Sequence, residues 1–354
     1  MNNGKIFRVL VVDDSALARR AIAEALERDP QLEVVGSAID PYDAREKILE
    51  LSPDVITLDL EMPRMDGLTF LKILMEHHPL PVVVVSSLTQ AGSIKAMEAI
   101  SLGALDVLAK PDGGLGLGEL SQRLAFHVKA AAQARPGASY ASGQGEDKEV
   151  APSTLPPGGF SSSKVILIGA STGGVEALRF LLPQLPRGLP PILVVQHIPK
   201  NFSRLMAERL NELCPFPVRE AQQGDELHPG LCLIAPGDWH LALQTDLAGY
   251  KVRLTQSPPL HYCRPAVDIL FRSGAEEAGS NALAILLTGM GVDGARGMLA
   301  LHKAGATTLA EHEDSCVVYG MPQAAIKMKA VDRVVSLPHM PAAIMQSLRK
   351  SNRT

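Results

Sequence analysis

The chain has 354 residues, which is enough for about two domains of ordinary size, each with its own hydrophobic core. Hydrophobic residues make up 46% of the chain and charged residues 20%, which excludes wholesale disorder and fibrous repeats. A net charge of −4 and an aromatic content of 4% argue against a nucleic-acid-binding protein. The negative charge lies in the first third of the chain. Residues 1–130 contain 13 Lys and Arg and 19 Asp and Glu, whereas the remaining residues contain 21 Lys and Arg and 19 Asp and Glu.

The sequence predicts neither a membrane helix nor a signal peptide. Uninterrupted apolar stretches such as residues 282–287 are far shorter than the roughly 18 residues that cross a bilayer. The N-terminal run FRVLVV leads directly into two acids with no small-residue cleavage site, which predicts a strand rather than a signal peptide. The four cysteines form no C-x-x-C pair and are interpreted as reduced core thiols. We therefore expect a cytoplasmic protein that is not a membrane protein.

Residues 1–134 are predicted to form the first domain. Short β-branched runs alternate there with longer amphipathic segments, which is typical of βα units and a parallel sheet covered on both faces. The five strand-like runs are FRVLVV, LEVVGS, DVITL, PVVVV and ALDVLA. The pattern predicts a doubly wound, flavodoxin-like α/β domain.

Residues 135–163 are predicted to be a flexible linker, because 19 of these 29 residues are Gly, Pro, Ser, Ala or Thr. Strand and helix patterns resume at KVILIGA, so we expect a second, Rossmann-like α/β domain over residues 164–354. The runs LCLIAP and KVRLTQ have no helical segment between them. They predict a local antiparallel hairpin in this domain.

Acidic residues follow two strands of the first domain. Asp13 and Asp14 come directly after the first strand, and Asp59 comes directly after the third. The carboxyl ends of parallel strands form a ligand crevice at one edge of the sheet, where three carboxylates could bind Mg²⁺ through oxygen atoms. Ser86 and Lys110 end the fourth and fifth strands and could hold phosphoryl oxygens. The alternative is that Asp13 and Asp14 merely cap the following helix.

This pattern, with the segment LDLEMPRMDGL after the third strand, resembles the receiver domain of two-component response regulators. The resemblance covers about 125 residues. It implies that a histidine kinase phosphorylates Asp59, with Mg²⁺ bound by Asp59 and the two acids that follow the first strand. It also implies a phosphoryl contact for Lys110 and a hydroxyl switch for Ser86. The adjacent Ser87 stays open as an alternative for the switch.

The second domain begins with a strand and the turn GASTGG, in which Ser171 occupies the centre of a G-x-S-x-G motif. Such a strand-to-helix turn exposes a serine hydroxyl beside backbone N–H groups that can stabilise an oxyanion. A dinucleotide-binding turn is an alternative, but the next strand ends in Gln196 and His197 instead of an acid. An ordinary α/β-hydrolase is also disfavoured, because Ser171 follows the first strand of its domain.

His197 and Asp293 follow two other strands of the second domain. If those strands lie beside the first one, all three side chains share one edge of the sheet. His197 could then accept the Ser171 proton, and Asp293 could orient the imidazole. The alternatives are a packing histidine and an aspartate that only caps the next helix. His240 and His261 are predicted to line the same cleft.

The motifs GASTGG, VVQHIP, CRPAVDILFRS and LTGMGVDG, behind a receiver and a linker, resemble the chemotaxis protein-glutamate methylesterase (CheB) family. The resemblance covers the chain outside the linker. It implies a nucleophile at Ser171, a base at His197 and an orienting carboxylate at Asp293. Thr172 and Met290 fall in the family's active-site loops, where backbone oxyanion contacts are expected.

The implied activity is a phosphorylation-activated serine esterase that hydrolyses glutamyl methyl esters on chemoreceptors, releases methanol and deamidates glutamines in chemotaxis adaptation. The resemblance also implies that the receiver covers the catalytic edge until it is phosphorylated. The partners are then methyl-accepting chemoreceptors and a histidine kinase, and the esterase chemistry needs no cofactor. The alternative from another class is a non-catalytic, phosphorylation-dependent adaptor with a degenerate hydrolase domain.

Overall fold

A computed structural model of the chain describes residues 5–86, 90–110, 117–134, 163–247 and 249–350. The chain divides into two compact units, Met1–Pro136 and Gly137–Thr354, and each is described here by itself. The predicted linker lies outside the described residues, except for Ser163.

The first unit contains a five-stranded parallel sheet with the strand order β2-β1-β3-β4-β5, which is the flavodoxin-like order predicted from the sequence. Strands β3 and β4 are buried along their whole length, as expected for the centre of a sheet covered on both faces. The strands are β1 (Phe7–Val12), β2 (Leu32–Ala38), β3 (Val55–Leu58), β4 (Val82–Ser86) and β5 (Asp106–Ala109).

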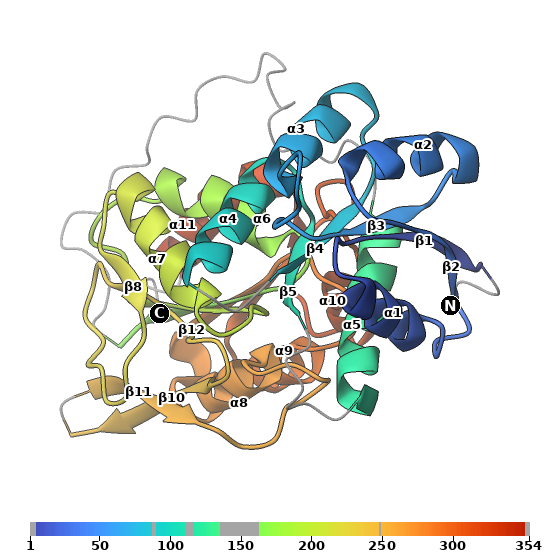
Figure 1. Cartoon of the computed structure of the whole chain (residues 1–354). Helices are drawn as coiled ribbons and strands as arrows, with labels where there is room; N and C mark the ends of the chain where they lie inside the picture. The colour runs from blue at the N-terminus through green and yellow to red at the C-terminus, as the bar shows by residue number, and fades with distance from the viewer. Residues whose placement is uncertain (1–4, 87–89, 111–116, 135–162, 248, 351–354) are drawn as a thin grey trace, which may run out of the picture. The chain divides into compact units, whose positions relative to one another are not determined.

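Helices cover both faces of this sheet (Figure 1). Helices α1 and α5 pack against each other on one face, and α2, α3 and α4 lie on the other. Ser15 caps α1, since its hydroxyl accepts a hydrogen bond from the N–H of Ala18. The helices are α1 (Ala16–Leu26), α2 (Pro41–Leu51), α3 (Gly67–His77), α4 (Gln90–Ser101) and α5 (Leu117–Ala132).

The second unit contains a seven-stranded parallel sheet with the order β14-β13-β12-β6-β7-β9-β8. Strands β6, β7 and β12 are adjacent at its centre and fully buried, so their carboxyl ends meet at one edge. The strands are β6 (Val165–Ala170), β7 (Ile192–Gln196), β8 (Val218–Glu220), β9 (Cys232–Ile234), β12 (Ala282–Leu286), β13 (Thr307–Glu311) and β14 (Arg333–Val335).

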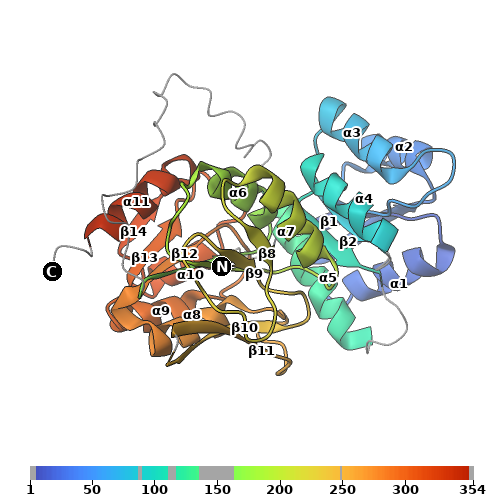
Figure 2. The ribbon, with the colours of Figure 1, turned by 90° about the vertical axis from the view of Figure 1, so that its left-hand side faces the viewer.

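Two helical layers enclose this sheet, with α6, α7 and α11 on one face and α8 and α9 on the other (Figure 2). Helix α8 packs against β6 and α9, and its Leu270 and Phe271 belong to the hydrophobic core. The helices are α6 (Gly174–Leu181), α7 (Phe202–Leu213), α8 (Val267–Glu277), α9 (Ala295–Lys303), α10 (Met321–Lys327) and α11 (Met340–Lys350), with 3-10 turns η2 (Leu182–Gln184), η3 (Gly279–Asn281) and η4 (Leu337–His339). None of the helices in the described residues is both long and apolar enough to cross a membrane.

The antiparallel hairpin is present, but one of its predicted strands is wrong. Strand β11 (Gly249–Thr255) pairs with β10 (His240–Asp246), and Leu243 lies opposite Val252. The run LCLIAP instead supplies β9, which is parallel to β7 and β8. An unbroken apolar run, such as that of β9, is typical of a strand buried on both faces. Strand β10 contains a polar histidine and glutamine, which weaken the sequence pattern that predicts a strand.

Candidate functional site

The nucleophile turn connects the end of β6 to the start of α6. Gly173 has a φ of 80°, a left-handed conformation that favours glycine, and this lets the chain reverse directly after Thr172. The N–H of Ser171 donates to the carbonyl of Thr288 at 3.0 Å, and the carbonyl of Ser171 accepts from the N–H of Gly174 at 2.7 Å. The turn is therefore held on both sides of the serine, as a strand-to-helix elbow requires.

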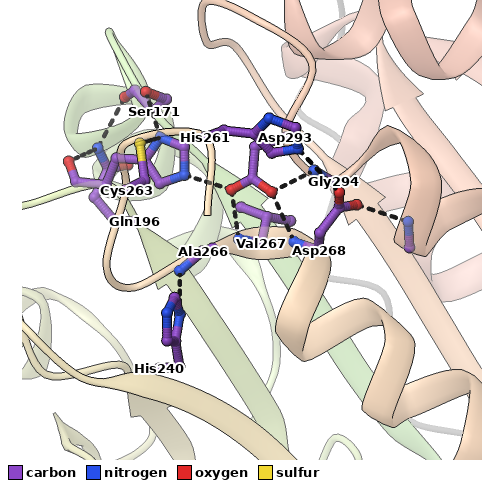
Figure 3. A network of polar contacts seen from close by, with 12 residues as sticks. Ser171, Gln196, His240, His261, Cys263, Ala266, Val267, Asp268, Asp293 and Gly294 are labelled. Atoms are coloured by element: carbon purple, nitrogen blue, oxygen red, sulfur yellow. Dashed lines mark hydrogen bonds and ion pairs between the residues drawn. The ribbon is translucent and has the colours of Figure 1, made fainter. Parts of the chain in front are cut away.

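Ser171, His197 and Asp293 form one hydrogen-bonded chain. Figure 3 labels Ser171 and Asp293, the two ends of this chain. The Nδ1 atom of His197 lies 3.0 Å from Oγ of Ser171, and its Nε2 lies 2.7 Å from Oδ2 of Asp293. All three residues are buried, with exposed fractions of 1%, 6% and 2%. Because a carboxylate only accepts, the imidazole proton is assigned to Nε2, which leaves the Nδ1 lone pair facing the serine hydroxyl.

Asp293 is fixed by the backbone of two helix starts. Its Oδ2 also accepts from the N–H of Val267 at 2.7 Å, and its Oδ1 accepts from the N–H groups of Asp268 and Gly294, both at 2.9 Å. Burial would raise the pKa of this carboxyl, but the hydrogen bonds from His197 and the backbone lower the pKa below its usual value. Asp293 therefore stays ionised and holds the imidazole in one orientation.

Gln196 supports the turn and the histidine together. Its Nε2 donates to the carbonyl of Ser171 at 2.8 Å and to the carbonyl of His197 at 3.1 Å. In the sequence, Gln196 indicated only that a dinucleotide site is absent. Its position directly before His197, at the end of a strand adjacent to β6, is the signal that could have indicated this role.

Thr172 and Met290 lie in the two loops beside the serine. Thr172 is buried, and its carbonyl accepts from Oγ1 of Thr288 at 3.0 Å. Gly289, which precedes Met290, approaches Ser171 so closely that a Cβ built on it would lie 2.7 Å from Cβ of Ser171. The carbonyl of Gly289 accepts from the N–H groups of Gly320 and Met321, which fixes the loop just before Met290.

His240 and His261 have different surroundings. His240 is fully buried, and its Nδ1 accepts from the N–H of Ala266 at 3.1 Å, so it supports a loop and does not line an open cleft as predicted. Nε2 of the half-buried His261 lies 3.5 Å from Oδ2 of the buried Asp268. His261, Asp268 and Asp293 lie close enough to hold a metal ion, but four donors already occupy the oxygens of Asp293. This group is therefore interpreted as a structural support around Asp293.

Cys263 and Glu311 are further buried groups near the serine. Sγ of Cys263 lies 3.4 Å from Nδ1 of His197, although the sequence suggested only a core thiol. Oε2 of Glu311 accepts from the N–H of Thr288 at 2.8 Å. Burial raises the pKa of Glu311 to about 7. Cys263 begins the motif CRPAVDILFRS, but the motif alone did not indicate its contact with His197, and no motif pointed to Glu311. The proximity of both residues to the serine follows from the tertiary structure.

The acidic pocket of the first unit lies at the carboxyl ends of β1, β3 and β5. Nζ of Lys110 lies 2.9 Å from Oδ2 of Asp13 and 2.7 Å from Oδ2 of Asp59. Burial raises the pKa of Asp59, and the nearby Asp13 charge adds to this, while Lys110 opposes it. Burial would lower the pKa of Lys110, but its contacts with both carboxylates raise it.

Asp14 and Ser86 complete the pocket. The carboxyl oxygens of Asp13, Asp14 and Asp59 lie within 4.8 Å of one another, and Asp14 is exposed. This oxygen-only donor set suits Mg²⁺. Ser86 is fully buried at the end of β4, and its Oγ has no hydrogen-bond partner among the described residues. Ser87, the alternative hydroxyl, lies outside the described residues.

Comparisons with known proteins agree with this two-unit organisation. Residues 9–121 match the response regulator receiver domain, and residues 166–344 match the CheB methylesterase family. A protein-glutamate methylesterase/protein-glutamine glutaminase of Syntrophus aciditrophicus is 49% identical over 339 residues, covering 96% of this chain and 98% of the relative. The protein of that name from Salmonella typhimurium is 47% identical over 344 residues, covering 96% of this chain and 97% of the relative.

A solved structure also matches the second unit. The CheB methylesterase catalytic domain of Thermotoga maritima aligns with a TM-score of 0.51 at 38% sequence identity. The alignment covers 52% of this chain and 99% of that domain. Both the sequence and the structure comparisons agree with the resemblance stated from the motifs. The chain therefore belongs to the CheB methylesterase family and carries an N-terminal response regulator receiver domain.

Proposed function

We propose that the chain is a phosphorylation-activated serine esterase that hydrolyses glutamyl methyl esters on chemoreceptors and deamidates glutamines. The observation that carries the proposal is the continuous chain of hydrogen bonds from Ser171 through His197 to Asp293. The relatives named protein-glutamate methylesterase/protein-glutamine glutaminase match almost the full chain, which supports the same substrate class. A degenerate, non-catalytic adaptor is disfavoured because the nucleophile, base and orienting carboxylate are all present and connected.

The first half of the reaction acylates the serine. Oγ of Ser171 attacks the ester carbonyl carbon while its proton moves to Nδ1 of His197. Asp293 accepts the hydrogen bond of Nε2 and stabilises the imidazolium that forms. The proton then passes from Nδ1 to the methoxy oxygen, the C–O bond breaks, and methanol leaves. Backbone N–H groups of the Thr172 and Met290 loops are proposed to bind the developing oxyanion.

The second half releases the receptor carboxylate. Water donates a proton to Nδ1 of His197 and attacks the acyl carbon, and the Ser171 Oγ then leaves with that proton. A glutamine amide follows the same steps with ammonia as the leaving group. No cofactor is needed for these steps, because each proton and each new bond is assigned to a named atom.

Phosphorylation is proposed to occur at Asp59, between Lys110 and the two acids that follow β1. Asp13, Asp14 and Asp59 would hold Mg²⁺, which neutralises charge on a phosphoryl group when it is bound. Lys110 is already placed to contact phosphoryl oxygens, and the Ser86 hydroxyl is proposed to act as the switch. Phosphorylation would shift an existing equilibrium toward the active arrangement of the chain.

The proposed domains are the receiver over residues 1–134, the linker over 135–163 and the catalytic domain over 164–354. The proposed partners are methylated chemoreceptors and a histidine kinase that donates the phosphoryl group. The four cysteines are free thiols in the structure, which is typical of proteins in a reducing compartment. We accordingly place the proposed reaction in the cytoplasm.

The test is methanol release from methylated receptor membranes, measured with the purified full chain and a small acyl phosphate as phosphodonor. We expect Ser171→Ala to lower the rate by about 10⁴-fold or more. Ser280→Ala provides the matched control, because this exposed serine lies in η3, and it should retain the wild-type rate. Methanol release that survives Ser171→Ala would refute the proposed nucleophile.

A further inference from the structure

The base of the proposed triad has two neighbours on the same nitrogen. Oγ of Ser171 lies 3.0 Å from Nδ1 of His197, and Sγ of Cys263 lies 3.4 Å from it (Figure 3). With the imidazole proton on Nε2, Nδ1 offers one lone pair to two possible donors. A hydroxyl is the stronger donor, so Ser171 can keep the hydrogen bond in the resting site while the thiol packs beside it.

The loop before α8 fixes this thiol through contacts on each side of it. The N–H of Cys263 donates to the carbonyl of Leu260 at 2.9 Å, and the N–H of Leu260 donates back at 3.1 Å. Nε of Arg264, the next residue, donates to Oδ1 of Asp238 at 3.0 Å. The N–H of Ala266 donates to the buried His240. The fold therefore fixes the position of Cys263, which is not a freely rotating surface residue.

The role of the Cys263 thiol can change when the imidazole of His197 becomes charged. After the proton of Ser171 has moved to Nδ1 of His197, that nitrogen becomes a donor and needs an acceptor until the proton passes to the leaving group. Sulfur is a weak acceptor, and Sγ of Cys263 lies within hydrogen-bond distance of Nδ1. No new covalent bond to sulfur is required, and the proton ends on methanol.

We propose that Cys263 is a positioning residue of the esterase, whose thiol holds the His197 ring beside Ser171 and partners Nδ1 while the ring is protonated. This inference rests on the proposed function, because it assigns a second partner to the same base. It gives a role to a buried cysteine that the triad alone leaves unexplained.

The charged and titratable groups around His197 allow a test by pH. Asp293 faces Nε2, Cys263 faces Nδ1, and Asp268, His240 and His261 lie behind the carboxylate. Burial would lower the pKa of His197, but the contacts with Cys263 and Asp293 raise it well above its usual value. Since the base must be neutral to accept a proton, removing the sulfur should move the acidic limb of kcat/KM to lower pH.

The experiment compares Cys263→Ala and Cys263→Ser with the wild-type full chain across pH 5 to 9. We expect Cys263→Ala to lower kcat by about 10-fold, the scale of one lost hydrogen bond, with KM unchanged within about twofold. The acidic limb should shift to lower pH in this variant. Cys263→Ser keeps a polar hydrogen-bonding atom and should recover kcat to within about threefold of wild type.

Cys214→Ala is the matched control, because Cys214 is a partly buried thiol at the end of α7 with no hydrogen bond to the triad within the described residues, and it should behave as wild type. Unfolding followed by the fluorescence of Trp239, the single tryptophan, separates lost catalysis from lost folding. A wild-type kcat and pH limb in Cys263→Ala would overturn the inference, as would equal losses in the Ala and Ser variants with an unmoved limb. Failure of the proposed function is distinct, since wild-type protein would then release no methanol.

Discussion

The two sites of this chain both lie at the carboxyl ends of parallel strands, yet they are built differently. In the second unit, Asp293 accepts four hydrogen bonds from His197 and three backbone N–H groups. In the first unit, three carboxylates lie close together, Lys110 contacts those of Asp13 and Asp59, and Asp14 is exposed. The triad is satisfied by groups of the same chain, whereas the acidic pocket holds more negative charge than its lysine balances.

This difference shows that sites at the carboxyl ends of parallel strands can serve two kinds of chemistry. A site that moves a proton between its own side chains benefits from fixed geometry before substrate arrives. A site that receives a phosphoryl group needs free oxygen ligands and an available hydroxyl, such as the unpaired Oγ of Ser86. The catalytic unit should therefore be sensitive to the loss of internal contacts, and the receiver should be sensitive to the loss of ions.

Among the variants that keep the serine, the largest expected effect is in Asp293→Asn, which removes the negative charge and lets an amide face the imidazole. The amide can hold the wrong tautomer of His197, so we expect kcat to fall by about 10³- to 10⁴-fold. Methanol release with receptor membranes measures this. The control Asp314→Asn changes an aspartate with a side chain that is 81% exposed and should have little effect. A loss below about 10-fold in Asp293→Asn would mean that the carboxylate does not orient the base.

The second prediction concerns the receiver. Chelation of Mg²⁺ or the substitution Asp59→Asn should abolish the rise in methanol release caused by a phosphodonor, while leaving the basal rate within about twofold. The physical reason is that the ion and the phosphoryl acceptor belong to the acidic pocket alone. Parallel assays with and without phosphodonor check it. Basal activity that requires Mg²⁺ would break the proposed separation of the two chemistries.

The third prediction concerns the buried Glu311, whose pKa is raised from 4.5 to about 7. Between these pH values the unfolded chain ionises while the folded chain stays protonated, so this group's contribution is fully present below pH 4.5 and is lost as pH rises to 7. Wild type should lose about 2 to 3 kcal/mol of unfolding free energy between pH 5 and pH 8 that Glu311→Gln does not lose. Urea unfolding followed by Trp239 fluorescence measures the difference. Identical pH dependence in the two proteins would show that Glu311 ionises normally.

Sequence patterns predicted the sites better than they predicted the groups supporting them. Ser171, His197 and Asp293 each follow a strand, so their convergence could be expected once β6, β7 and β12 were assumed to be neighbours. Cys263 begins the motif CRPAVDILFRS, but it does not follow a strand, so no rule of strand ends predicts its contact with His197, 66 residues away in the chain. The wrong hairpin strand has a related cause. The pairing of β10 with β11 depends on local turn and packing contacts, whereas the sequence prediction relied on the apolar run that forms β9.

The most direct test of the central claim is to identify the residue that becomes covalently modified by an active-site phosphonate that mimics the tetrahedral intermediate. Peptide mass spectrometry of the full chain should find one adduct per chain on Ser171, formed together with the loss of methanol release. His197→Ala should slow the labelling, because the serine hydroxyl then lacks its base. An adduct on another residue, or full methanol release from protein labelled completely at Ser171, would contradict the account.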